Sequence, residues 1–107
     1  MSPAHLAAVA ASAAHVPTAP VSTCAVRFML DADAEPGLLP RLLQPFAKRD
    51  LVPDRMWSHR QRDVLHVELA MDAMPSDLVH LVEGNLRQVV GVRGVSRAPE
   101  RALRDAA

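Results

Sequence analysis

Apolar and polar residues alternate with a period of two between residues 22 and 30. The apolar phase consists of Cys24, Val26, Phe28 and Leu30, and the other phase of Ala25, Arg27 and Met29. A period of two is typical of a strand with one buried face. We therefore expect a strand here, with Cys24 as a small buried hydrophobic residue near its start.

Two later stretches carry apolar residues at helical spacing. The first stripe consists of Leu38, Leu39, Leu42, Leu43 and Phe46, and the second of Leu78, Leu81, Val82, Leu86 and Val89. Each stripe predicts an amphipathic helix, with Arg41 on the solvent side of the first. Pro45 falls inside the first helix, where it costs about 3 kcal/mol, so we expect a kink or an early end there. The second helix is expected to start at Ser76 and Asp77.

Three more strands are predicted, over Val52–His59, Val64–Met71 and residues 90–95. The short polar connector Arg60–Asp63 joins the first two as an antiparallel hairpin, although it lacks an Asn-Gly turn signal. Counting back from this connector places Trp57 opposite His66, and His59 opposite Val64. The two histidines are thus not expected to pair directly.

The predicted order of elements is strand, helix, strand, strand, helix, strand. Two such βα units predict a four-stranded antiparallel sheet with both helices on one face, which is a ferredoxin-like βαββαβ sandwich of the α+β class. Trp57 and His66 then share the sheet face that the helices leave open. An exposed tryptophan there indicates a protein contact, unless a tail or loop of the chain packs over it.

The ends of the chain differ in composition from the predicted domain. Residues 1–21 are rich in Ala and Pro and are expected to form a flexible tail. The apolar run over residues 6–14 also permits a signal peptide, but no Lys or Arg precedes it, which favours the tail. Residues 98–107 are expected to form a second, loose tail. The domain itself is predicted over residues 22–97.

Composition excludes several classes of function. Twelve basic and twelve acidic residues cancel, so the basic face typical of nucleic-acid binding is not indicated. The single cysteine excludes an intramolecular disulfide and a thiolate metal cluster, and favours a cytoplasmic location. No apolar run approaches the roughly 18–20 residues of a membrane helix. With only three aromatic residues, the core is expected to be aliphatic.

The polar residues do not form a recognisable catalytic or metal site. Asp31, Asp33 and Glu35 place three carboxylates in five residues. This spacing permits cation binding but is more typical of a solvated cluster at a helix start. His59 and His66 lack a third metal ligand. The serines and Cys24 have no partners for a nucleophilic triad, so we expect no enzyme activity, no cofactor and no metal.

Four segments resemble the ACT domain, a small amino-acid-sensing regulatory module. They are Phe28-Met-Leu-Asp31, Glu35-Pro-Gly-Leu-Leu39, Phe46-Ala-Lys-Arg49 and Leu86-Arg-Gln-Val-Val-Gly-Val-Arg-Gly-Val95. The last segment looks like the second helix and final strand of the regulatory subunit of acetolactate synthase. The resemblance implies a side-by-side homodimer that holds effector amino acids between its protomers.

The resemblance also implies which residues form the effector site. These residues are Asp33, Ala34, Glu35, Pro36, Gly37, Leu38 and Val52. Gly37 matches the family glycine, whose missing Cβ lets a ligand carboxylate approach the backbone amides at a helix start. Ala34 and Val52 depart from the pattern, because acetolactate-type modules usually carry asparagine at both positions. Asp33 or Glu35 remains to bind an effector ammonium.

Two hypotheses of function follow. The first is a dimeric, non-catalytic ACT module that binds an amino acid and regulates a metabolic enzyme in trans, most simply the catalytic subunit of acetolactate synthase in branched-chain amino-acid biosynthesis. The second is a ligand-free assembly module that docks a partner protein through Trp57 and His66 on the open sheet face.

Overall fold

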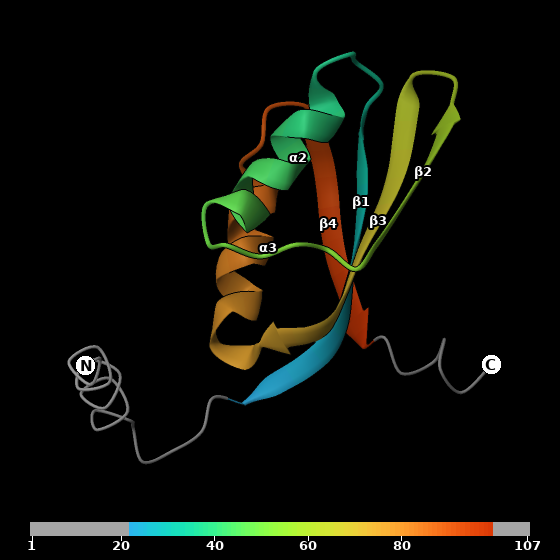
Figure 1. The fold of residues 1–107 in the computed structure, drawn as a ribbon. Coiled ribbons are helices and arrows are strands. Elements are labelled where there is room, and N and C mark those ends of the chain that lie inside the picture. Colours follow the sequence, from blue (N-terminus) through green and yellow to red (C-terminus); the bar gives the residue numbers. More distant parts are fainter. Residues whose placement is uncertain (1–21, 100–107) are drawn as a thin grey trace, which may run out of the picture.

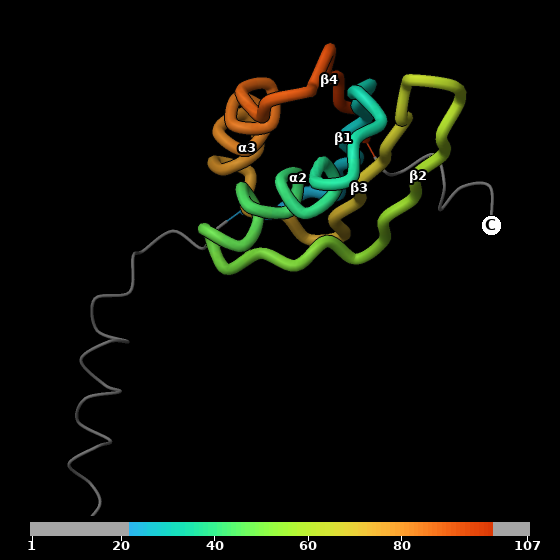
Figure 2. Tube along the Cα trace, turned by 90° about the horizontal axis from the view of Figure 1, so that it is seen from above, coloured from blue at the N-terminus to red at the C-terminus, as the bar shows by residue number. Residues whose placement is uncertain are grey.

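The computed structural model describes residues 22–99 of the chain. Its elements are β1 (Thr23–Asp33), α2 (Leu38–Ala47), β2 (Arg55–Gln61), β3 (Val64–Pro75), the short 3-10 helix η1 (Ser76–Leu78), α3 (Val79–Arg87) and β4 (Val92–Pro99). The four strands form one antiparallel sheet in the order β2-β3-β1-β4 (Figure 1). Both helices lie on the same side of the sheet, as the view along the strands shows (Figure 2). The predicted ferredoxin-like sandwich is confirmed.

The core lies between the helices and one face of the sheet. Strand β1, in the centre, supplies Val26, Phe28, Leu30 and Ala32, and each is buried. Phe28 meets Phe46 of α2 edge to face, with 5.9 Å between the ring centroids. Apart from these two rings the buried residues are aliphatic or Met, as composition predicted. The helix α2 includes Pro45 and ends soon after it, at Ala47.

Cys24 is exposed, so its predicted burial is wrong. The pairing of β1 with β3 shifts register between Cys24 and Val26. The regular alternation predicted over Cys24–Leu30 is therefore broken at this irregularity, before Val26. Cys24 instead lines a shallow surface groove with Val79 and Pro99.

The buried stripe of α3 also differs from the prediction. Val79, Val82 and Leu86 are buried, whereas Leu81 is 42% exposed. Val79, Val82 and Leu86 follow one another at intervals of three and four residues and so lie on one side of α3. Leu81 is turned by about 100° from Val82 and lies at the edge of that side.

The strand boundaries are corrected in three places. Strand β2 begins at Arg55 rather than Val52, because Pro53 has no N–H to donate to a neighbouring strand. Strand β3 continues to Pro75. Strand β4 starts at Val92 and runs to Pro99, beyond the domain end expected at residue 97. The tail predicted over residues 1–21 lies outside the described residues, as does the part of the predicted C-terminal tail (residues 98–107) from residue 100 onward.

The hairpin register is shifted from the predicted one. Gln61 pairs with Val64, so the turn has two residues, and His59 lies directly opposite His66. Arg62 adopts a φ of +59°, which allows this tight turn without an Asn-Gly sequence. The shift amounts to two residues in the partner strand and therefore preserves the faces. Trp57 and His66 share the open face as expected, but the partner of Trp57 is Glu68.

Candidate effector turn and open sheet face

Most backbone amides of the turn between β1 and α2 are already hydrogen-bonded to other backbone groups of the protein. The Ala34 N–H donates to the Asp63 carbonyl at 2.9 Å, and the Glu35 N–H to the Asp33 carbonyl at 2.9 Å. The Leu38 N–H donates to the Glu35 carbonyl at 3.1 Å. Pro36 has no N–H. Within residues 22–99, the amide of Gly37 is the one in this turn for which the structure gives no acceptor.

The feature of Gly37 that bears on this site is a close approach of a side chain, not its backbone conformation. Its φ of −92° and ψ of 4° are accessible to any residue. A Cβ at this position, however, would lie 3.1 Å from Nη2 of Arg41. The missing side chain therefore lets a guanidinium group lie against the backbone of the turn.

Arg41 is the residue of this site that sequence reasoning missed. It was expected to face solvent, but its guanidinium folds back across the turn. Its Nη1 donates to the Val90 carbonyl at 2.8 Å, and its Nη2 to Oε1 of Glu35 at 3.2 Å. The available signal was its spacing, since residues four apart on a helix lie on one face and Arg41 follows Gly37 by one turn.

The three carboxylates of this segment do not form one cluster. Asp31 and Asp33 belong to β1, and the first turn of α2 carries no acidic residue, so the predicted helix-start cluster is wrong. Asp31 bonds Nδ1 of His66 at 2.6 Å, and Asp33 bonds Nε of Arg93 at 2.7 Å. In the described part of the chain, no group of three His, Cys, Asp or Glu residues is placed to hold a metal ion.

The structure brings together six of the seven predicted effector-site residues, and Val52 stands apart. Val52 is 79% exposed, in the loop before β2. The neighbouring Asp54 N–H bonds the Ala70 carbonyl beside the start of β2, whereas the Ala34 N–H bonds the Asp63 carbonyl at the hairpin, so the two places lie at opposite ends of β2 (Figure 1). Leu38 is fully buried, and its side chain belongs to the core.

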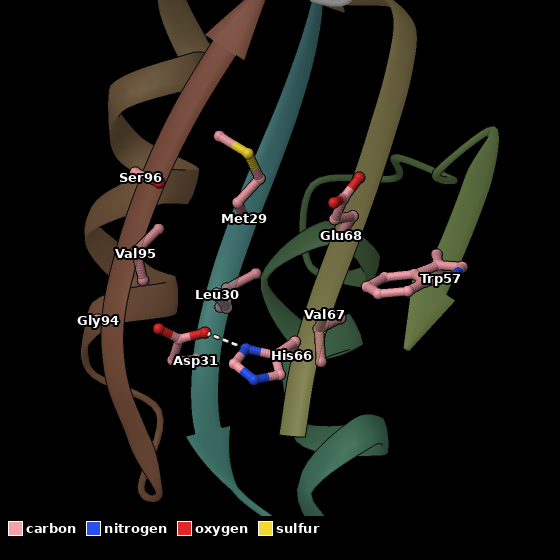
Figure 3. Close-up of a pocket in the computed structure, with 10 residues that line it drawn as sticks. All are labelled: Met29, Leu30, Asp31, Trp57, His66, Val67, Glu68, Gly94, Val95 and Ser96. Carbon is pink, nitrogen blue, oxygen red and sulfur yellow. Dashed lines mark hydrogen bonds and ion pairs between the residues drawn. The ribbon is translucent and has the colours of Figure 1, made fainter. Parts of the chain in front are cut away.

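Trp57 and His66 both line a hollow on the open sheet face. The hollow has a volume of about 380 Å³, and Trp57 reaches across from β2 toward β3 at its side (Figure 3). Trp57 is 52% exposed. Its ring stacks on His59 with 5.9 Å between centroids, and His59 stacks on His66 at 6.4 Å. The open face thus carries a row of three rings from two strands.

The fold and the strand-to-helix turn together define a small α+β module with one sheet face left open. The model of the ACT-like domain family matches residues 19–102. The chain therefore belongs to the ACT-like domain family, and the predicted resemblance is confirmed at that level. No curated protein matches the chain significantly.

Solved structures with the same fold come from several kinds of protein. The ACT domain of GTP pyrophosphokinase from Chlorobium tepidum aligns with a TM-score of 0.62 at 16% identity, covering 71% of this chain and 99% of that one. An uncharacterized protein from Thermotoga maritima gives 0.59 at 14% identity, covering 73% and 98%. A homoserine dehydrogenase from Thiobacillus denitrificans gives 0.62 at 19% identity, covering 78% of this chain and 20% of that enzyme. At these identities the likeness shows the fold alone.

ACT domains are typically regulatory modules that bind ligands, and the described residues are consistent with that class. Among residues 22–99, no helix has the length and apolarity required to cross a membrane.

Proposed function

We propose that this chain is a non-catalytic regulatory module that binds an amino-acid effector at the β1–α2 turn and modulates a metabolic enzyme in trans. The observation that carries the proposal is the grouping of opposite charges around Gly37. The guanidinium of Arg41 suits an α-carboxylate, and the carboxylate of Glu35 suits an α-ammonium. These two groups replace the asparagines that the chain lacks at Ala34 and Val52.

Effector binding on this proposal exchanges one ion pair for two. Arg41 and Glu35 bond each other at 3.2 Å, and their side chains are 40% and 41% exposed. An ion pair this exposed contributes no more than about 1 kcal/mol, so opening it costs little. The effector carboxylate then accepts hydrogen bonds from Arg41 and from the Gly37 amide, and Glu35 holds the ammonium.

A homodimer supports this function because it can complete the site. The turn that contains Gly37 lies at the hairpin end of β2, and Val52 precedes the other end. A side-by-side dimer would bring Val52 of one protomer toward the turn of the other. We infer that the effector sits between two protomers in the cytoplasm, with neither nucleic acid nor a membrane as partner.

The partner that we propose is the catalytic subunit of acetolactate synthase. The support is the resemblance of residues 86–95 to the regulatory subunit of that enzyme. The effector would then be a branched-chain amino acid. Regulation in trans fits a chain whose described residues show no catalytic constellation.

The alternative function is a ligand-free assembly module that docks a partner protein on the open sheet face. The observation that favours it is the 52% exposure of Trp57 beside an open hollow. Aromatic residues with one exposed face are enriched where proteins meet.

Sedimentation equilibrium and co-purification with the acetolactate synthase catalytic subunit test the regulatory proposal. We expect a dimer at micromolar concentration and a complex that alters the activity of the catalytic subunit. A protein that stays monomeric and forms no complex would contradict both the dimer and the partner.

A further inference from the structure

We propose that the hollow on the open sheet face is a binding site for an organic cation, either an ammonium or a guanidinium group. The hollow lies between β2, β3, β1 and β4 and is separate from the effector turn (Figure 3). Its volume of about 380 Å³ lies within the range of roughly 300–1,000 Å³ usual for small-ligand pockets. Binding here does not depend on the function proposed for the turn.

The charges around the hollow favour a cation. Asp31 and Glu68 contribute carboxylates to its lining, and none of the described residues that line it is Lys or Arg. Asp31 bonds Nδ1 of His66, which satisfies one oxygen and leaves the carboxylate 59% exposed. Glu68 meets Arg27, outside the lining, at a distance of 3.7 Å, which is too long for a strong hydrogen bond. Both carboxylates can therefore accept further donors.

Trp57 supplies the second attraction for a cation. Its indole stacks on His59 and is 52% exposed beside the hollow. A cation within about 6 Å of an indole centroid is attracted by the negative potential of the ring face. Because Glu68 lies directly opposite Trp57 in the β2–β3 pairing, a cation can contact the ring and the carboxylate together.

Gly94 leaves space on the β4 side of the hollow (Figure 3). It pairs with Asp31 across the β1–β4 ladder, and a Cβ at this position would meet no atom within 4 Å. Its backbone does not adopt the positive φ that favours glycine. Neither conformation nor crowding requires glycine here. The absence of a side chain instead keeps free space beside the Asp31 carboxylate, which a ligand can use.

The guanidinium or ammonium group that binds this hollow can come from one of two kinds of molecule. It can belong to a free organic cation, or to an Arg or Lys side chain of a protein that docks on the open face. The chemistry of recognition is the same in both, and the affinities of a small probe and a peptide probe distinguish them.

Fluorescence of Trp57 provides the test, since it is the single tryptophan of the chain. The full chain is titrated with n-butylguanidinium, with neutral n-butylurea, and with the capped peptide acetyl-Gly-Arg-Gly-amide. We expect saturable quenching by n-butylguanidinium, with a dissociation constant on the order of 1 mM, and none by n-butylurea. A peptide that binds about 10-fold tighter assigns the site to a protein side chain, and equal affinity assigns it to a free cation. Equal responses to the guanidinium and the urea, or no saturation by ~50 mM, would overturn the proposal.

Three variants locate the binding. Glu68→Gln is expected to weaken n-butylguanidinium binding about 5-fold, because it removes one charge from the hollow. Gly94→Val is expected to weaken binding less than Glu68→Gln does, because it fills space on the β4 side of the hollow, away from Trp57, while circular dichroism shows an unchanged fold. Asp77→Asn removes the same charge from η1, which does not line the hollow, and should leave binding unchanged. Binding that is unchanged by Glu68→Gln, or that falls equally with Asp77→Asn, would show that the cation does not occupy the hollow.

Discussion

A single side chain, Arg41, organises the effector turn. It contacts Glu35 on one side and the Val90 carbonyl on the other, and it lies against Gly37. The planar guanidinium can make these contacts simultaneously because its five donors point in fixed directions. The same geometry suits the carboxylate of an amino acid. The guanidinium that holds the turn together is therefore the same group that we propose to bind the effector carboxylate.

Two glycines near the start of β4 are expected to respond differently to substitution. Gly91 precedes the strand and Gly94 lies within it. Gly91 has a φ of +102°, and a Cβ there would lie 3.3 Å from Cδ1 of Leu38. Gly91→Ala should therefore lower the free energy of unfolding by about 1–2 kcal/mol. Gly94→Ala meets no atom and should change the free energy by less than about 0.5 kcal/mol, or raise it slightly. Urea denaturation measures both, and equal losses would contradict the assigned backbone conformations.

The position of Arg41 could not be predicted from the local sequence. Its main acceptor, the Val90 carbonyl, is 49 residues away, and the helical pattern places Arg41 on the polar side of α2. The direction of a long side chain depends on acceptors that are distant in the sequence, and hydrophobic periodicity does not identify those acceptors. The pairing of Asp31 with His66 and of Asp33 with Arg93 was hidden for the same reason.

At the element scale, the incorrect predictions concern strand register and helix faces. The two-residue turn at Arg62 shifted the hairpin and placed His59 opposite His66. On α3, Leu81 lies at the edge of the predicted stripe and is exposed. Hydrophobic patterns predict the type of an element well, but its phase and register depend on turn geometry.

A pair of leucines tests the assigned helix faces. Leu42 is fully buried on α2, and Leu81 is 42% exposed on α3. Leu42→Ala should lower the free energy of unfolding by about 2–5 kcal/mol, because it leaves a cavity in the core. Leu81→Ala should lower it by less than about 1 kcal/mol. Thermal or urea unfolding measures the difference, and a larger loss for Leu81→Ala would place that side chain in the core.

At the scale of the whole molecule, the fold was predictable because its determinants are redundant. Two helical stripes, an alternating central strand and a polar hairpin connector all indicate the same βαββαβ order, and the structure confirms it. The effector site was less predictable because its parts are dispersed. The turn that contains Gly37 lies at the hairpin end of β2, whereas Val52 precedes the other end of that strand.

Calorimetric titration of the twenty amino acids into the purified full chain tests the proposed regulatory function most directly. We expect at least one amino acid, branched-chain ones first, to bind with measurable heat. Arg41→Ala should abolish that heat, because it removes the proposed partner of the effector carboxylate. The control Arg87→Ala, which alters an exposed i,i+4 pair with Glu83, should bind normally. Heat from none of the twenty, or equal binding by Arg41→Ala, would contradict an effector site at this turn and favour the assembly module.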